Sequence, residues 1–171
     1  MVKVGINGFG RIGRLILRAL LENYKGKIQV VGINDLGSIE ANAHLIKFDS
    51  THGTLNHDVK TIKDGLQIGD QNIKVFAERD PAKLPWGKIG ADVVLECTGF
   101  FLDKKSAGKH IDAGAKKVII SAPAKEVDFT VVQGVNSKDL KKEHNIISNG
   151  SCTTNCLAPV AMVLENTFGI E

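Results

Sequence analysis

Aromatic residues make up only 5% of this 171-residue sequence, which has a single tryptophan and a single tyrosine. Proteins that bind nucleic acids commonly stack bases on aromatic rings and gather positive charge on one surface. Here the net charge is only +3, and lysines occur as isolated pairs at 104–105, 116–117 and 141–142. The composition therefore predicts that nucleic acid is not a partner.

Cysteines and long apolar runs are scarce as well. The three cysteines, Cys97, Cys152 and Cys156, form an odd and sparse set, which is unlike a disulfide framework and fits a reducing compartment. No apolar run approaches the roughly 20 residues that a bilayer-spanning helix needs. The first residues, MVKVGINGFG, also lack the pattern of a secretory signal. We therefore expect a cytoplasmic protein without a membrane partner.

Short apolar runs alternate with helix-period segments along the chain. Apolar runs predict strands at 2–6, 28–33, 92–97 and 117–121, and three- to four-residue periodicity predicts helices at 11–20, 38–48 and 103–113. Three short runs between 59 and 77, split by Asp-Gly and Gly-Asp turns, predict an antiparallel insertion, and further strands are expected at 129–132 and 145–148. This order predicts an α/β fold: a Rossmann-type, doubly wound, mostly parallel sheet with an antiparallel insertion.

A glycine-rich loop joins the first predicted strand to the first predicted helix. In Gly8-x-Gly10-x-x-Gly13, the first glycine permits a tight turn, the second lets a pyrophosphate approach the backbone, and the third lets the helix pack on the strand. The N–H groups at the start of that helix favour phosphate. Asp35 closes the second strand, where a carboxylate accepts hydrogen bonds from an adenosine ribose and repels a 2′-phosphate. This unit predicts NAD as cofactor rather than NADP; the alternative is that the glycines only turn the chain and Asp35 only caps the next element.

Cys152 lies at the entrance of a helix predicted over about 153–168. Ser151 is a natural N-cap, and the positive end of a helix stabilises a thiolate in its first turn. The hydroxyls of Ser151, Thr153 and Thr154 and the free N–H groups could stabilise an oxyanion. Together these groups suit nucleophilic attack on a carbonyl carbon.

Cys156 falls one turn after Cys152, which leaves two interpretations open. The pair could hold a metal or be redox-active, or Cys152 could be a nucleophile with a packed neighbour. A metal would need more ligands, and His144 alone is poor support, so we expect no metal. We favour a structural Cys156, able to form an oxidative disulfide with Cys152. Cys97, in an apolar strand, is expected in the core.

With these residues placed, the sequence resembles phosphorylating glyceraldehyde-3-phosphate dehydrogenase. The resemblance extends from the first residues to the last helix, and its most specific segment contains SCTTNC. The segments that carry it are NGFGRIG (7–13), IND (33–35), DSTHG (49–53), ERDP (78–81), ECTGFF (96–101), AGAKKVIISAP (113–123) and SNGSCTTNCLAP (148–159).

The resemblance implies a role for each candidate residue. It implies that the intact protein oxidises glyceraldehyde 3-phosphate to 1,3-bisphosphoglycerate in glycolysis, with NAD and inorganic phosphate, through a thiohemiacetal and a thioester on Cys152. Ser151 and Thr153 would help to bind the phosphate. The cofactor-binding residues would be Gly8, Gly10, Arg11, Ile12, Gly13, Asp35, Arg79, Thr98, Gly99, Phe101 and Ser121.

The family also places a general-base histidine and further substrate-binding residues beyond Glu171. The chain therefore resembles the first half of the enzyme, with an NAD-binding domain at 1–150 and the first helix of the catalytic domain at 151–171. We expect the fragment to be inactive, its five histidines to serve surface or packing roles, and the intact enzyme to be a homotetramer. Two alternatives remain: erythrose-4-phosphate dehydrogenase, which shares the cofactor loop and SCTTNC, and a bare NAD-binding module without turnover.

Overall fold

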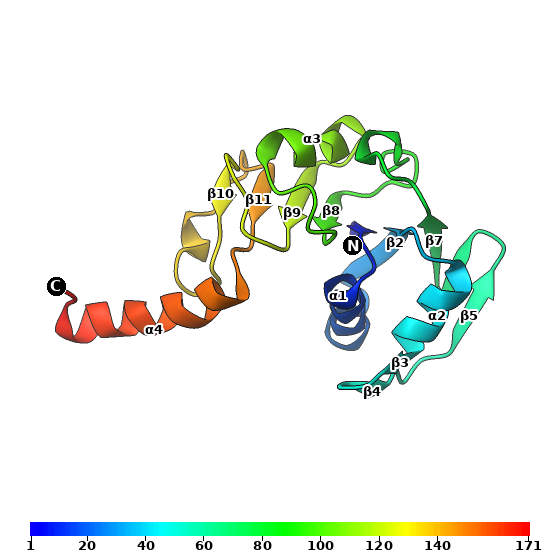
Figure 1. Cartoon of the computed structure of the whole chain (residues 1–171), viewed down its shortest axis with the longest axis horizontal. Coiled ribbons are helices and arrows are strands. Elements are labelled where there is room, and N and C mark those ends of the chain that lie inside the picture. The colour runs from blue at the N-terminus through cyan, green and yellow to red at the C-terminus, as the bar shows by residue number, and fades with distance from the viewer.

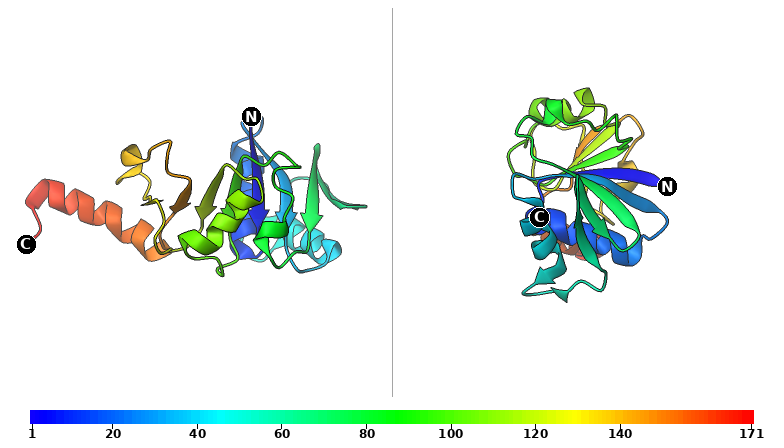
Figure 2. Two further views of the ribbon diagram at one scale, coloured as in Figure 1. Left: turned by 90° about the horizontal axis from the view of Figure 1, so that it is seen from above. Right: turned by 90° about the vertical axis from the view of Figure 1, so that its right-hand side faces the viewer.

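The computed structural model describes all 171 residues and shows one large twisted sheet with helices on both faces (Figures 1 and 2). The sheet has nine strands in the order β10-β11-β9-β8-β1-β2-β7-β6-β5, and β3 and β4 pair separately. The strands are β1 Val2–Asn7, β2 Ile28–Asn34, β3 Phe48–Asp49, β4 Gly53–Thr54, β5 Val59–Ile62, β6 Gly65–Ile68, β7 Gln71–Phe76, β8 Val93–Glu96, β9 Lys117–Ile120, β10 Phe129–Thr130 and β11 Ile146–Ser148.

The central part of the sheet is parallel. β1 pairs in parallel with β2 on one side and with β8 on the other, and β9, β11 and β10 extend that parallel side. On the opposite side, β7 pairs in parallel with β2 but antiparallel with β6, which in turn pairs antiparallel with β5. This topology confirms the predicted doubly wound sheet with an antiparallel insertion.

The helices are α1 Arg11–Asn23, α2 Ile39–Lys47, α3 Lys104–Asp112 and α4 Cys152–Phe168, with short 3₁₀ turns at Pro81–Lys83 and Ser137–Asp139. Three begin at side-chain caps: Ser38 Oγ accepts from the Ala41 N–H at 3.1 Å, Asp103 Oδ1 from the Ser106 N–H at 2.8 Å, and Ser151 Oγ from the Thr154 N–H at 2.9 Å. These caps satisfy N–H groups that have no partner inside the helix. The predicted cap at Ser38 is thus confirmed.

The two faces of the sheet have separate cores. On the first face, Leu17 of α1 and Ile46 of α2 pack with Ile6 and Ile33 of the central strands. On the other, Ala107 of α3 packs on Val118, Ile120 and Ile146, and a further cluster surrounds Trp86. α1 and α2 lie on one side and α3 on the other (Figure 1). Burial of both faces explains why the central strands read as apolar runs without alternation.

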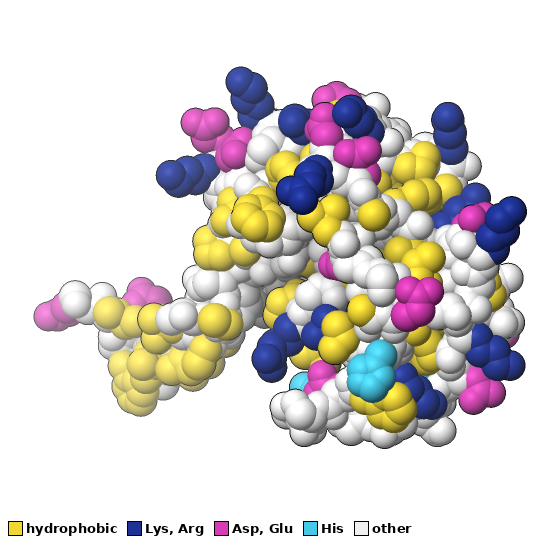
Figure 3. Space-filling view, turned by 45° about the vertical axis from the view of Figure 1, so that its right-hand side comes forward, with side chains coloured by type: hydrophobic (Ala, Val, Ile, Leu, Met, Phe, Trp, Pro, Cys, Tyr) yellow, Lys and Arg dark blue, Asp and Glu magenta, His cyan; other side chains and the backbone are white.

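α4 leaves the sheet after β11 and projects away from the rest of the molecule (Figures 1 and 2). None of its residues is buried. Hydrophobic side chains gather along the projecting helix (Figure 3), and Leu157, Val163 and Phe168 are 61%, 58% and 80% exposed. The apolar side of α4 is therefore exposed in this chain. No helix in the chain is long and apolar enough to span a bilayer.

Candidate functional site

A cavity of about 510 Å³ opens where the central parallel strands end. Its volume falls within the range of about 300–1,000 Å³ that is usual for ligand pockets, and this edge of an open α/β sheet is where ligands bind in such folds. Twelve residues line it: Asn7, Gly8, Gly10, Asn34, Asp35, Leu36, Glu78, Arg79, Cys97, Thr98, Phe100 and Phe101.

The glycine-rich loop forms one wall of this cavity. Gly8 has φ +91°, and a side chain there would lie 2.8 Å from the backbone at Cys97 and Thr98. A side chain on Gly13 would lie 2.2 Å from the Gly8 carbonyl oxygen. Gly10 differs, because a side chain there would meet nothing within 4 Å. Gly8 and Gly13 are therefore required by packing, whereas the face of Gly10 is open to a ligand.

The start of α1 suits an anionic group. Gly10 is its N-cap, and no side chain hydrogen-bonds to this end of the helix. The first-turn N–H groups, including those of Arg11 and Ile12, thus have no side-chain cap, and the helix dipole adds partial positive charge. A dinucleotide's pyrophosphate fits this place, since it would receive these donors at the one glycine that leaves space.

Asp35 lies beside the loop, directly after β2, and is half-buried. Its Oδ2 accepts from the Phe9 N–H and its Oδ1 from the Gly37 N–H, both at 2.8 Å. The carboxylate therefore ties the glycine-rich loop to the end of β2. Each oxygen keeps further acceptor capacity, which is what hydrogen bonds from ribose hydroxyls would need.

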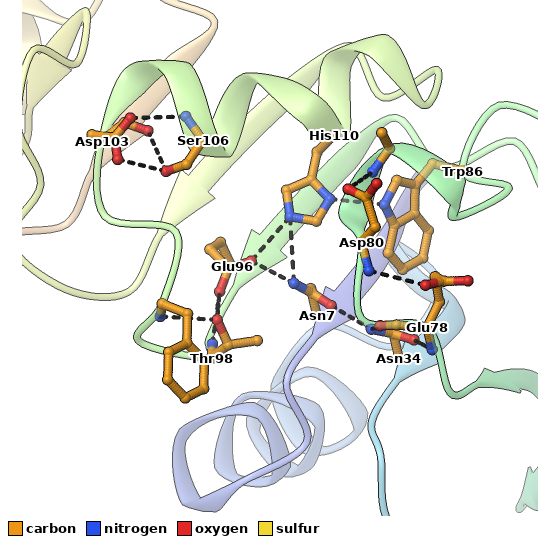
Figure 4. A network of polar contacts seen from close by, with 12 residues as sticks. Asn7, Asn34, Glu78, Asp80, Trp86, Glu96, Thr98, Asp103, Ser106 and His110 are labelled. Atoms are coloured by element: carbon orange, nitrogen blue, oxygen red, sulfur yellow. Dashed lines mark hydrogen bonds and ion pairs between the residues drawn. The ribbon is translucent and has the colours of Figure 1, made fainter.

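A polar network beneath the cavity joins the ends of β1, β2 and β8 (Figure 4). Asn34 Nδ2 donates to Asn7 Oδ1 at 2.7 Å and to the Glu78 carbonyl at 2.8 Å, while Asn34 Oδ1 accepts from the Glu78 N–H at 2.8 Å. Asn7 Nδ2 donates to Glu96 Oε2 at 2.5 Å. Three strand ends and the segment after β7 are thus fixed relative to one another.

The segment after β8 forms the third wall. The Thr98 N–H donates to Glu96 Oε1 at 2.8 Å, the Thr98 hydroxyl also contacts Glu96 Oε1, and Thr98 Oγ1 accepts from the Phe100 N–H at 3.1 Å. Phe100 is 84% exposed. An exposed ring at the rim of a pocket provides a flat apolar surface for a planar ligand group.

Cys97 packs against the core, as expected, but it also lines the cavity. Burial raises the pKa of its thiol to about 11, with a smaller opposing contribution from a hydrogen bond to Ser121. A thiol with so high a pKa is protonated near neutral pH and is a poor nucleophile. Cys97 is therefore no competitor for the nucleophilic role predicted for Cys152.

Cys152 is the first residue of α4, and its side chain is exposed. Ser151 Oγ accepts from the Thr154 N–H at 2.9 Å, which makes Ser151 the N-cap that the sequence predicts. The segment follows β11, a parallel strand of the same sheet, so it leaves the edge at which the cavity opens. Cys156 is exposed and unpaired, and no group of three or more His, Cys, Asp or Glu side chains is arranged to hold a metal.

Six of the predicted cofactor residues line the cavity: Gly8, Gly10, Asp35, Arg79, Thr98 and Phe101. Gly13 is buried behind the loop, and Arg11 and Ile12 are exposed at the start of α1. Gly99 lies within the segment after β8, and the Ser121 N–H donates to the Glu96 carbonyl at 3.0 Å. Ser151, Cys152 and Thr153 do not line it. Sequence reasoning missed Asn7, Asn34 and Glu96. Each is a polar residue at the end of an apolar strand, and this position could have marked them as candidates.

These features define a dinucleotide-binding domain of the doubly wound α/β class. Residues 2–104 match the family model described as the NAD-binding domain of glyceraldehyde 3-phosphate dehydrogenase, and the chain belongs to this family. Its domain is therefore an NAD-binding one.

Full-length relatives show similarity along the whole chain. It is 55% identical over 170 residues to glyceraldehyde-3-phosphate dehydrogenase of Xanthobacter flavus, 57% identical over 170 residues to that of Zymomonas mobilis, and 56% identical over 170 residues to that of Geobacillus stearothermophilus. Each match covers 99% of this chain and 50–51% of the relative. The chain thus spans about half the length of the relatives that it matches.

Proposed function

We propose that this chain is the cofactor-binding half of an NAD-dependent, phosphorylating glyceraldehyde-3-phosphate dehydrogenase. Residues 1–150 would form the NAD-binding domain, and 151–171 would begin the catalytic domain. The observation that carries the proposal is the position of Cys152: an exposed cysteine opens α4 directly after a parallel strand whose sheet edge carries the NAD pocket. The names of the relatives supply the reaction.

Each cofactor contact is assigned according to where the residue lies around the cavity. The N–H groups of Arg11 and Ile12 would hold the pyrophosphate beside Gly10, and Asp35 would accept from the adenosine ribose. Arg79, Thr98, Gly99, Phe101 and Ser121 would contact the adenine and nicotinamide ends. Bound NAD supplies the acceptor for a hydride.

The chemistry would proceed on Cys152. Its thiolate adds to the aldehyde carbon of glyceraldehyde 3-phosphate, forming a C–S bond and a thiohemiacetal. Loss of hydride and of the hydroxyl proton from the thiohemiacetal leaves a thioester. An oxygen of inorganic phosphate then attacks the thioester carbon, the C–S bond breaks, and the products are 1,3-bisphosphoglycerate and free thiolate. Ser151 and Thr153 would hold the attacking phosphate by hydrogen bonds.

The test is NADH formation by a full-length protein that contains this sequence, supplied with glyceraldehyde 3-phosphate, NAD and phosphate. We expect Cys152→Ser to abolish turnover, since a hydroxyl is far less nucleophilic than a thiolate, whereas Cys156→Ser should keep most of the activity. Equal loss in both variants would contradict a unique nucleophile. Comparison of kcat/KM with erythrose 4-phosphate decides between the two related dehydrogenases.

The 171-residue chain itself is proposed to bind NAD without turnover. His110 is fully buried in the network beneath the pocket, so it is not free to act as a base toward Cys152. Appreciable NADH formation by the isolated chain would refute this. For the intact enzyme we further propose a cytoplasmic homotetramer whose partners are the aldehyde phosphate and inorganic phosphate, with neither nucleic acid nor membrane involved.

A further inference from the structure

A chain of hydrogen bonds between buried side chains links the only tryptophan to the NAD pocket (Figure 4). Trp86 Nε1 donates to His110 Nδ1 at 2.9 Å, and His110 Nε2 lies 2.9 Å from Glu96 Oε2. Trp86 and His110 have no exposed surface, and Glu96 is 1% exposed. None of these three residues has a role in the function proposed above.

The tryptophan fixes the position of the proton on His110. An indole N–H can only donate, so His110 Nδ1 must present its lone pair to Trp86. In a neutral imidazole the proton is then on Nε2, which donates to Glu96. With the other tautomer, the Nε2 lone pair would face a carboxylate oxygen, and both hydrogen bonds would be lost.

Glu96 connects His110 to the wall of the pocket by hydrogen bonds. Its Oε2 receives the N–H groups of His110 and Asn7, and its Oε1 receives the N–H and hydroxyl of Thr98. Donors thus occupy both oxygens of the buried carboxylate. Loss of the His110 donor would leave a buried carboxylate short of a partner, and its rotation would release Thr98.

We propose that His110 is a positioning residue for NAD binding. With its proton held on Nε2 by Trp86, His110 orients Glu96, and Glu96 holds the segment from Thr98 to Phe101 in the shape that lines the pocket. His110 does not line the pocket, and it reaches the pocket wall through the hydrogen bonds of Glu96 to Thr98 and through its edge-on ring contact with Phe101, at 6.3 Å between ring centroids. The proposal relies on the NAD-binding character of the domain and not on the chemistry at Cys152.

The test compares three variants of the full chain. Trp86→Phe keeps an aromatic ring but removes the N–H, His110→Gln keeps an N–H donor, and His110→Leu removes all donors. NMR of the imidazole nitrogens should show Nε2–H in the parent chain, and in Trp86→Phe a shift toward Nδ1–H or a mixture. The Thr98 amide resonance should move in Trp86→Phe and His110→Leu. Calorimetry should show NAD binding weakened about tenfold in both, as expected for a lost hydrogen bond to a charged group, and largely restored in His110→Gln.

His144→Gln is the matched control. His144 stacks on Phe129 and does not line the pocket, so its replacement should leave the Thr98 amide and NAD affinity unchanged. A folded His110→Leu chain with an unmoved Thr98 amide and unchanged NAD affinity would overturn the proposal. If Trp86→Phe fails to fold, the contrast between His110→Gln and His110→Leu decides. If no form binds NAD, the cofactor role of the isolated chain fails, and the Thr98 amide alone decides whether His110 positions the segment.

Discussion

At the scale of single residues, the glycines of the phosphate loop separate packing from ligand access. Gly13 has no room for a side chain because the Gly8 carbonyl oxygen would lie 2.2 Å from its Cβ, while Gly10 faces open space. These roles are predictable from the sequence, because the spacing of the motif indicates that a phosphate approaches the second glycine and that the helix packs at the third. The structure supplies the distances that make the roles testable.

Replacing Gly13 should mainly lower stability, whereas replacing Gly10 should mainly lower NAD affinity. We expect Gly13→Ala to lower the free energy of unfolding by about 1–3 kcal/mol, because the new methyl group collides with backbone that cannot rotate away. Gly10→Ala should change stability by less than about 1 kcal/mol, yet weaken NAD binding. Urea unfolding and calorimetric titration measure the two quantities. Unchanged NAD affinity in Gly10→Ala would contradict the placement of the pyrophosphate.

Asp35→Asn tests the ribose contact while sparing the loop. An amide oxygen can still accept from the Phe9 N–H, so the tie between loop and β2 should persist. Removal of the negative charge should weaken NAD binding and relax the preference for NAD over NADP, because the 2′-phosphate is no longer repelled. The measurement is the ratio of the two dissociation constants. An unchanged ratio would refute the ribose role.

At the scale of elements, the sequence predicts where helices begin but not which side they bury. The starts of α1, α2 and α3 follow from the glycine loop, Ser38 and Asp103. The three- to four-residue spacing of apolar residues predicts a buried stripe on α1 that includes Ile12 and Ala19, but the structure leaves both exposed.

The buried sides carry polar residues that break the apolar pattern. α1 buries Leu17, Leu21 and also Arg18, whose guanidinium donates to the carbonyls of Ile46, Lys47 and Gly53. α2 buries Asn42 and Ile46. Apolar spacing predicts instead that Ala41, Leu45 and Phe48 share one buried side, and all three are exposed. The correct side of α1 could have been found from Gly13, because the side that touches the sheet there continues one and two turns later at Leu17 and Leu21.

The contacts of the polar network could not be predicted from local sequence patterns, for a related reason. Asn7, Asn34 and Glu96 are far apart in the chain and meet only because β1, β2 and β8 are neighbours whose carboxyl ends share one edge. Strand order is a property of the whole sheet, and local periodicity does not determine it. The cofactor roles of the glycine-rich loop and Asp35 were predictable, whereas the hydrogen bonds that join Asn7 to Asn34 and Glu96 were not.

We expect Asp128 to stabilise the β10–β11 edge of the sheet in a way that depends on pH. The Lys104 ammonium at 2.6 Å, with the backbone N–H groups of Ile146 and Asn145, lowers the pKa of this carboxyl to about 2 from 3.8. Because the folded pKa lies below the unfolded one, this stabilisation is complete above about pH 4 and is lost as the pH falls toward 2.

Replacement of Asp128 measures that contribution. Asp128→Ala should cost about 1–2 kcal/mol of unfolding free energy at neutral pH, from the lost hydrogen bonds. The difference from the parent chain should shrink toward pH 2, as seen by urea unfolding at a series of pH values. A difference that does not vary with pH would show that the contribution does not depend on the charge of Asp128.

At the scale of the whole molecule, α4 stands apart from the cooperative core. None of its 17 residues is fully buried, and Pro159 removes one internal hydrogen bond. Isolated helices of about this length are marginal in water. We therefore expect hydrogen exchange of α4 amides in dilute solution to be many times faster than that of α1, which is shorter but packs Leu17 and Leu21 into the core. Equal protection at all concentrations would contradict this; protection that rises with concentration would show a second chain covering the apolar side.

The place of β1 in the sheet also bears on how the chain folds as it is synthesised. β1 is central and leaves the ribosome before either of its two partner strands, which begin at Ile28 and Val93. Until β8 has emerged, one edge of β1 has no strand to pair with, and such an open edge invites pairing with other chains. Pairing over so long a loop is also slow. Nascent chains that stall between α1 and β8 should therefore be the species that most need chaperones.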